Sequence, residues 1–202
     1  MSTPYPPEPW DLAGVGHLTT WSVPASALPP LPFSATPVTV RGRATVSTAF
    51  VAYSAAGLMA YDELLAAVVV RHGRRVGLSI TDIWVDSETS MLGGRGLWGI
   101  PKELATFGAA PHLGASTPAG PIASTSFTPR RLPGLPLPFP LRGSVVQTLH
   151  ERTVASPIRA SGRLRAASAT WDLAPDGPLA WLRAGRPLTS LVAEDFRMRF
   201  GR

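Results

Sequence analysis

Proline and glycine interrupt this chain so often that long helices are nearly excluded. The 202 residues include 22 prolines and 19 glycines, and a proline inside a helix removes a hydrogen bond and clashes with the preceding turn. The segments between them alternate polar and apolar residues with the period of two that is typical of strands. Hydrophobic residues make up 45% of the chain and charged residues 16%. We therefore predict one mainly β domain over residues 1–202, a barrel or sandwich without a helix layer.

The clearest local prediction is a β-hairpin, in which the turn HGRR at residues 72–75 joins two apolar strands. The predicted strands are residues 39–54 (one long strand or a bent pair), 63–70, 76–85, 156–173 and 187–200. In the last of these, alternation places Phe196, Met198 and Phe200 on one face and Arg197 and Arg199 on the other.

Two irregular segments interrupt the strands. Residues 86–88 (Asp-Ser-Glu) can cap a helix, and we expect a short helical turn there that ends at Gly93 and Gly94, with another extended segment starting at Lys102. Five prolines lie between Pro129 and Pro140. They predict a stiff surface loop that could rim a pocket.

The net charge of +6 and the pI near 10.9 raise the possibility of nucleic-acid binding. The arginines are scattered, several in i, i+2 pairs typical of the exposed face of a sheet, and the aromatic residues do not interleave with them as a stacking platform would require. We therefore expect no nucleic-acid partner. The N-terminus has an acidic residue and four prolines in place of a signal peptide, and prolines interrupt the uncharged residues 12–40. We expect a cytoplasmic protein without a membrane segment.

Cofactor and metal motifs are weak. GRGLWG at residues 94–99 matches GxGxxG, but Ile100 and Pro101 follow where a dinucleotide site needs a helix. The four histidines are far apart and the chain has no cysteine, so no metal site is predicted. We expect no cofactor.

Eighteen of the nineteen basic residues are arginine, and the single lysine is Lys102. An amine can lose its proton and attack a carbonyl, whereas a guanidinium stays charged. Lys102 is thus a candidate imine-forming nucleophile. The alternative is a compositional bias with one lysine left at an indifferent surface position.

The surroundings of Lys102 resemble a known family. GRGLWGIPKELA at residues 94–105 is similar to the GRxxxGxPKxLA segment of the acetoacetate decarboxylase family. YDEL at residues 61–64 resembles the upstream YxEx stretch of that family, and DSE at residues 86–88 resembles its DxE. The spacing from Glu63 to Lys102 agrees without gaps.

This resemblance implies a curved, cone-like β-barrel with few short helices that assembles into homo-oligomers. It implies that Lys102 forms a Schiff base with a small keto acid or other carbonyl substrate, with Glu63 beside it, followed by decarboxylation or by related aldol or dehydration chemistry. The amine must be neutral near pH 7, so we expect burial to lower the pKa of Lys102. Acetoacetate decarboxylase is itself a familiar example of a lysine activated by its surroundings in this way.

Departures from the family pattern support a second hypothesis. Glu103 stands where the decarboxylases have a second lysine, Thr48 where they have a second acid, and Val15 about where they have a substrate-binding arginine. A non-catalytic barrel that kept the fold and binds a small ligand therefore stays open. For Arg95 we consider contact with a substrate carboxylate, but favour pairing with Asp86 or Glu88.

Trp98 is considered as a substrate contact, and more readily as part of an apolar wall beside Lys102. The proposed substrate-binding set is thus Arg95, Trp98 and Thr48, alongside the catalytic pair Lys102 and Glu63.

Overall fold

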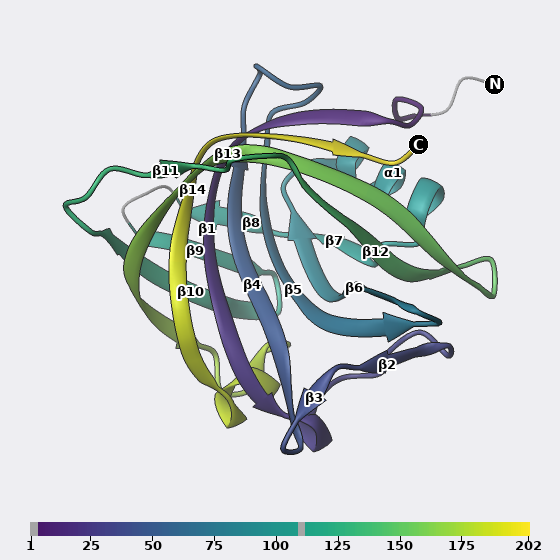
Figure 1. Cartoon of the computed structure of the whole chain (residues 1–202), viewed down its shortest axis with the longest axis horizontal. Coiled ribbons are helices and arrows are strands. Elements are labelled where there is room, and N and C mark those ends of the chain that lie inside the picture. Colours follow the sequence, from purple (N-terminus) through teal and green to yellow (C-terminus); the bar gives the residue numbers. More distant parts are fainter. Residues whose placement is uncertain (1–3, 109–111) are drawn as a thin grey trace.

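The computed structural model describes residues 4–108 and 112–202, which form strands with one α-helix and two 3-10 helices (Figure 1). In chain order the elements are β1 (Trp10–Pro24), η1 (Ala25–Ala27), β2 (Ala35–Pro37), β3 (Thr39–Val40), β4 (Arg43–Tyr53), β5 (Tyr61–His72), β6 (Arg75–Val85), α1 (Glu88–Trp98), β7 (Lys102–Leu104), β8 (Thr106–Gly108), β9 (His112–Thr117), β10 (Gly120–Pro129), β11 (Leu135–Pro136), β12 (Leu141–Leu149), β13 (Arg152–Leu173), η2 (Ala180–Ala184) and β14 (Arg186–Phe200). Within these ranges no helix has the length and apolar character needed to cross a bilayer.

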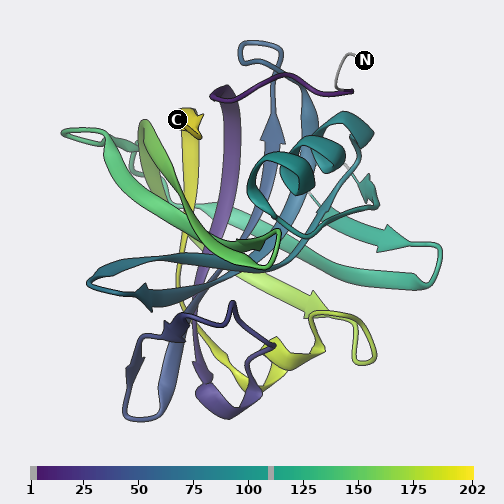
Figure 2. The same cartoon turned by 90° about the vertical axis from the view of Figure 1, so that its right-hand side faces the viewer.

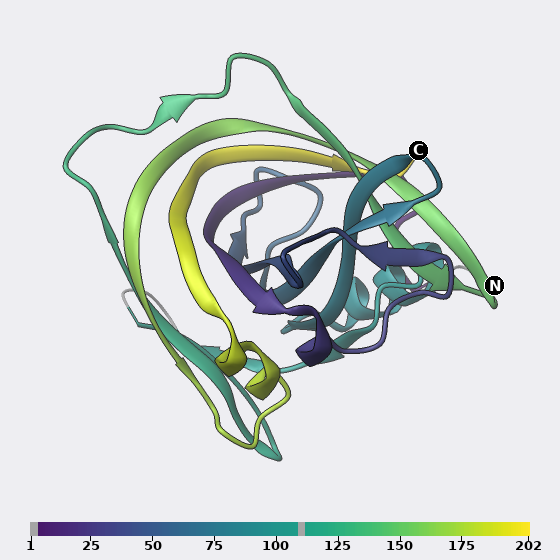
Figure 3. The same ribbon diagram turned by 60° about the horizontal axis from the view of Figure 1, so that its bottom comes forward.

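Seven of the strands close into a ring. Their order is β12-β6-β5-β4-β1-β14-β13, and β13 also pairs with β12. All neighbours are antiparallel except β12 and β6, which share a single parallel bridge between Val145 and Leu78. Figure 3 shows β13, β14 and β1 as nested arcs around the interior. The mainly β prediction is confirmed, and the strands form the curved ring expected of a barrel.

The long strand β13 belongs to two parts of the fold. Its N-terminal half pairs with β12, whereas its C-terminal end pairs with β10, which continues into β9 and β8. This extension covers the outer face of the ring and encloses a core that includes Phe50, Leu64, Val68, Trp84 and Ile122. The strands β4 to β6 are therefore buried on both faces. This explains why residues 63–70 are almost continuously apolar.

A second core lines the inside of the ring and lies next to helix α1. Its buried members include Trp10, Tyr61, Ile83, Trp98 and Phe200. Figure 2 shows α1 beside the strands, near the N-terminal segment. Because successive strand residues point to opposite faces, each strand of the ring contributes to both cores.

The predicted hairpin is confirmed as β5 and β6, with Gly73 at a positive φ of 57° in its turn. Residues 39–54 form the pair β3 and β4, and the last two predicted strands are β13 and β14. Four of the longer strands were not predicted: β1, β9, β10 and β12. Their sequences are rich in Gly, Ser, Thr and Pro, so alternation is weak, and pairing with neighbours decides their conformation.

Candidate functional site

Lys102 is the first residue of β7, which lies parallel to the end of β6 and places Lys102 opposite Ile83. The side chain of Lys102 points into the ring and is 4% exposed. Glu103, the next residue, points the other way and is exposed. The acid that departs from the family pattern is thus separated from the amine by the strand itself.

Helix α1 supports Lys102 from one side and differs from its prediction. The side chain of Ser87 caps its start by accepting from the Ser90 amide, as expected. The helix does not end at Gly93 and Gly94 but continues to Trp98, where Gly99 takes a left-handed conformation with φ 67°. A Cβ on Gly94 would lie 2.7 Å from Cδ of Lys102. Glycine is therefore needed there for close packing, and its helix-breaking tendency is overridden.

The Lys102 ammonium has a partner for each of its three hydrogens. Its Nζ donates to Oε2 of Glu63 at 2.8 Å, to Oγ of Ser90 at 2.8 Å and to the hydroxyl of Tyr61 at 3.4 Å. Because the acceptors come from β5 and from the first turn of α1, this arrangement holds the amine at one position in the ring.

Glu63 is held as firmly as Lys102. It is 3% exposed, and while Oε2 accepts from Lys102, Oε1 accepts from the hydroxyl of Tyr53 at 3.0 Å. The ring of Tyr53 lies against that of Tyr61, with centroids 4.4 Å apart. The two tyrosines and the acid thus form one buried polar cluster around the amine.

The electrostatics of this cluster differ from the sequence-based expectation. Burial lowers the pKa of Lys102, but the Glu63 carboxylate and the Tyr61 oxygen raise it by more, so the net shift is upward. In the protein without substrate, the pair is therefore an ammonium and a carboxylate. The expected lowering by burial operates and is the largest single cause, but the Glu63 carboxylate 2.8 Å away and the Tyr61 oxygen together outweigh it.

The tyrosines keep their protons. Burial raises the pKa of Tyr61 to about 12, even though the Lys102 charge acts to lower it. The pKa of Tyr53 is raised well above its usual range by burial, with the Glu63 charge adding to the effect. Both hydroxyls thus stay neutral at physiological pH and remain able to donate.

A cavity of about 280 Å³ opens beside this cluster inside the ring. Of the described residues that line it, Glu63 and Lys102 alone carry charge, and almost all the others are aliphatic or aromatic. Representative members are Leu12, Leu65, Ile80, Ile158, Met198 and Phe200. The cavity fits a small molecule whose one polar group meets Lys102.

Of the three predicted substrate contacts, Trp98 lines the cavity, whereas Thr48 and Arg95 do not. Trp98 lines the cavity, is 3% exposed and packs edge-on against Trp10 and Phe200, while its Nε1 donates to Oε2 of Glu8. Thr48 is buried on the opposite face of β4, where it accepts from Nε1 of Trp21. Because strand residues alternate, the cavity receives its neighbours Ser47 and Ala49 instead.

Arg95 is exposed and does not line the cavity. Among the described residues it forms no ion pair with Asp86 or Glu88, contrary to prediction. Its Nε donates to the backbone carbonyl of Lys102 at 2.6 Å. It therefore fixes the backbone that carries the amine, since α1 turns back toward β7 at Gly99.

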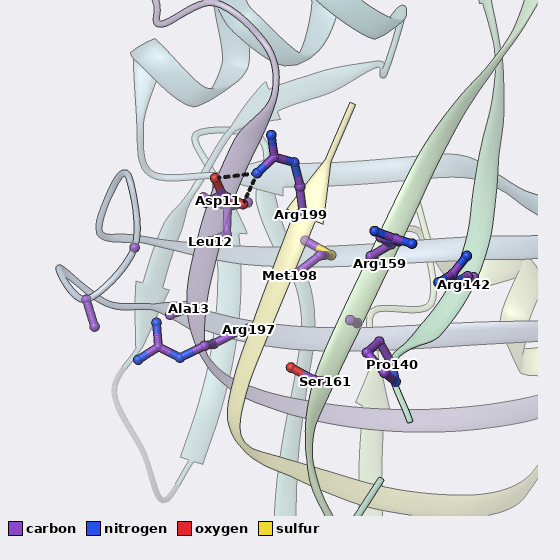
Figure 4. Close-up of a pocket in the computed structure, with 13 residues that line it drawn as sticks. Asp11, Leu12, Ala13, Pro140, Arg142, Arg159, Ser161, Arg197, Met198 and Arg199 are labelled. Atoms are coloured by element: carbon purple, nitrogen blue, oxygen red, sulfur yellow. Dashed lines mark hydrogen bonds and ion pairs between the residues drawn. The ribbon is translucent and has the colours of Figure 1, made fainter. Parts of the chain in front are cut away.

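The outer face of the same strands is charged, in contrast to the cavity. Figure 4 shows Arg142, Arg159, Arg197 and Arg199 on neighbouring strands of this face, with Arg199 paired to Asp11 at 3.2 Å. The predicted alternation of the last strand is confirmed, since Phe196, Met198 and Phe200 line the cavity.

Comparison with known proteins is consistent with this geometry. The family model described as acetoacetate decarboxylase (ADC) matches residues 2–121, more than half of the chain. The chain belongs to the acetoacetate decarboxylase family. Both Glu63 and Lys102 lie inside the matched region. No curated protein sequence matches the chain.

Several solved structures share the fold. Acetoacetate decarboxylase from Legionella pneumophila is 15% identical, with a TM-score of 0.71 over 99% of this chain and 88% of its own. An acetoacetate decarboxylase-like enzyme from Sphingomonas wittichii RW1 is 18% identical, with a TM-score of 0.67 over 99% and 93%. The enduracididine biosynthesis enzyme MppR in complex with pyruvate is 19% identical, with a TM-score of 0.64 over 96% and 88%.

Three members of the polar cluster were not predicted as site residues: Tyr53, Tyr61 and Ser90. Tyr61 lies two residues before Glu63 on the same strand face, so its position was readable from the family-like YDEL segment. Tyr53 pairs with Tyr61 across β4 and β5, and Ser90 reaches Lys102 only through the packing of α1. No local pattern indicates these two contacts.

Proposed function

We propose that this acetoacetate decarboxylase family member is a Schiff-base-forming lyase that acts on a small carbonyl substrate through Nζ of Lys102. One observation carries the proposal: the chain's single lysine is buried at the polar end of an apolar cavity, 2.8 Å from a buried acid. A surface lysine kept by chance has no reason to occupy such a position. Pyruvate bound to the structurally similar MppR supports a small carbonyl ligand.

The first step frees the amine. The Lys102 ammonium gives one proton to Oε2 of Glu63 along their existing hydrogen bond, leaving a neutral amine and a neutral carboxyl group. Two features favour this transfer: burial disfavours both charges, and the ammonium lies against the first turn of α1, where the helix dipole is positive. A substrate that fills the cavity removes remaining water, which strengthens both the effect of burial and that of the helix dipole.

The second step forms the imine. The lone pair of Nζ adds to the carbonyl carbon, and a proton from nitrogen moves to the carbonyl oxygen to give a carbinolamine. The Glu63 carboxyl group then protonates the hydroxyl, which leaves as water. The products are a protonated imine and the Glu63 carboxylate, so the ion pair present before reaction is restored around the new cation.

The protonated imine accepts the electron pair of a bond that breaks at the carbon adjacent to the imine carbon. Loss of CO2, of a proton or of an aldehyde would each give the same enamine, so decarboxylation, aldol chemistry and dehydration share this site. The neutral hydroxyls of Tyr53 and Tyr61 lie around Glu63 and Lys102, where they hold both groups in place. Trp98 contributes to the wall on which the substrate rests.

Hydrogen exchange tests the proposal. Incubating the protein with acetone in deuterium oxide should move deuterium into the methyl groups beside the carbonyl, because each enamine formed takes a deuteron from solvent. Mass spectrometry of the ketone measures the rate. The matched control is Lys102→Arg, which keeps the charge and cannot form an imine. Exchange no faster than in this variant, with any carbonyl compound tried, contradicts the proposal.

A second candidate function is the non-catalytic binding barrel, and the raised pKa of Lys102 favours it. In that case Lys102 and Glu63 form a structural ion pair, and ligands bind in the cavity without chemistry. The exchange experiment separates the two, because a binding barrel would protect the ligand without exchanging its hydrogens.

We also propose that the protein is a cytoplasmic homo-oligomer. The proline-rich segment between β10 and β12 exposes large apolar side chains: Leu132 at 75%, Leu135 at 73% and Phe139 at 69%. Its backbone is fixed to β13 through the Leu137 amide, which donates to the Gly162 carbonyl at 2.9 Å. A rigid apolar surface of this kind fits a second copy of the chain. Light scattering of the purified protein should give a multiple of 21.4 kDa; a monomer would contradict this proposal.

A further inference from the structure

We propose that the substrate of this site is an uncharged carbonyl compound with an apolar chain, and that the cavity rejects ketones carrying a carboxylate. The inference rests on the proposed function, because it concerns the molecule that meets Lys102. It differs from the keto-acid expectation raised by the sequence.

The charge inside the cavity is already balanced. Lys102 contributes one positive charge and Glu63 one negative charge, and these two are the charged groups among the described lining residues. A neutral ketone leaves the net charge at zero before and after imine formation. A keto acid would bring an unbalanced negative charge into an apolar space that already contains a carboxylate, and such burial is costly.

The arginines of the described residues lie outside the cavity, so they cannot pair with a substrate carboxylate there. Within residues 4–108 and 112–202 none of them lines the cavity, although β13 and β14 carry several. Arg197 and Arg199 alternate with Phe196, Met198 and Phe200, so the strand pleat sends every arginine of this stretch outward (Figure 4). Reaching the cavity would require a register slip of β14. The outward arginines are therefore not available to a substrate carboxylate.

The position expected to bind a carboxylate is also apolar here. Val15, which the family spacing places at the substrate-binding arginine, is 37% exposed and does not line the cavity. The residues of β1 that do line it are Trp10, Leu12, Gly16 and Leu18. The part of the cavity wall that β1 forms thus offers hydrocarbon contacts. An alkyl chain buried there is stabilised because its methylene groups leave water.

The experiment uses two matched methyl ketones: hexyl methyl ketone, and its analogue in which the terminal methyl of the hexyl chain is replaced by a carboxylate. Each is incubated with the wild-type protein and sodium borohydride, and the fraction of Lys102 reduced to the secondary amine is measured by mass spectrometry. The uncharged ketone should reach half-maximal trapping at a concentration roughly tenfold or more below that of its analogue. Equal trapping, or preference for the analogue, overturns this inference while leaving the Schiff-base proposal standing.

Binding without chemistry provides the independent readout. In the double variant Lys102→Met, Glu63→Gln the cavity carries no charge and cannot form an imine. Calorimetric titration should still show binding of hexyl methyl ketone and weaker binding of the analogue. If neither ketone is trapped by the wild type but the double variant still binds hexyl methyl ketone more tightly than the analogue, the Schiff-base proposal fails and the apolar specificity stands. If the double variant binds the analogue equally well, the apolar specificity fails.

Introducing a cation checks the physical cause. Ala49 lines the cavity from β4 and is 5% exposed. Ala49→Arg should improve trapping of the carboxylate analogue relative to hexyl methyl ketone, whereas Ala49→Met, which adds similar length without charge, should not. Thermal unfolding of both variants verifies that the fold is intact. An unchanged ratio in a folded Ala49→Arg protein contradicts the charge argument.

Discussion

Nζ of Lys102 and Oε2 of Glu63 lie 2.8 Å apart, with both side chains no more than 5% exposed. A buried ion pair is costly to assemble, because each charge loses its water. Hydrogen bonds from Tyr53 to Glu63, and from Lys102 to Ser90, offset part of this cost. The pair is better explained by chemistry at the amine than by stability.

Removing the acid should reverse the direction of the Lys102 pKa shift. In Glu63→Gln the main cause of the upward shift is gone and burial remains, so the amine should become neutral at lower pH than ordinary lysine. Acylation of Lys102 by an amine-reactive probe, followed against pH by peptide mass spectrometry, measures this. A midpoint that stays above the ordinary lysine value of about 10.4 would contradict the assigned cause.

The same substitution should destabilise the fold by about 3–5 kcal/mol at pH 7, because it leaves a buried group without its charge partner. Urea unfolding measures the free energy. Glu194→Gln is the matched control: it breaks the Arg165 ion pair, whose side chains are 30% exposed, and should cost no more than about 1 kcal/mol. Similar losses of unfolding free energy in both variants would show that the buried ion pair contributes no more to stability than the partly exposed one.

Alkaline pH should weaken the fold through this pair. The folded-state pKa of Lys102 is raised, so its contribution to stability is complete below the unfolded-state value of about 10.4 and is lost as pH rises through the folded-state value. The difference in unfolding free energy between wild type and Lys102→Met, Glu63→Gln should therefore shift against the wild type only above about pH 10.4. A difference that changes between pH 7 and 9 would contradict the upward shift.

Tyr61 provides an optical measure of the same cluster. The tyrosinate absorbance that is present in wild type and missing in Tyr61→Phe should appear with a midpoint of about 12. An ordinary tyrosine ionises near 10. A difference spectrum with a midpoint at that ordinary value would mean that Tyr61 is solvated, and that the cluster is more open than described.

The Gly94 contact can be tested by adding one methyl group. Alanine in place of a helical glycine normally stabilises by about 1 kcal/mol, but here Cβ would lie 2.7 Å from Cδ of Lys102. Gly94→Ala should therefore displace the amine from Glu63 and reduce imine formation by roughly tenfold or more. The control Gly114→Ala, whose Cβ would meet Ser124 at 3.8 Å, should leave it unchanged. Full imine formation in Gly94→Ala would show that the contact is not needed.

Much of the site was readable from sequence because its two reacting groups lie in family-like segments at fixed spacing. The β-hairpin and the alternation of the last strand followed from local patterns. The length of α1 did not, since its glycines predict an end that packing against Lys102 overrides. The Thr48 assignment did not hold, because its side chain lies on the face of β4 away from the cavity, and which face a strand residue takes depends on pairing within the sheet.

The charge state of Lys102 was the least predictable feature. Sequence reasoning anticipated burial, which lowers the pKa, but the distance between Glu63 and Lys102 is set by three-dimensional packing. With Glu63 at 2.8 Å, the carboxylate and the Tyr61 oxygen together outweigh burial. The same packing points the Glu103 side chain away from the amine. This acid stands where the decarboxylases have a second lysine, but it is not among the groups that shift the pKa of Lys102.

Borohydride trapping tests the central claim most directly. Wild-type protein is treated with a panel of methyl ketones, aldehydes and keto acids in the presence of sodium borohydride, and the modified residue is located by peptide mass spectrometry. The account predicts a reduced adduct on Lys102 with at least one compound, and no such adduct in Lys102→Arg. The complete absence of an adduct on Lys102 across the panel, in a protein whose fold is intact, would contradict it.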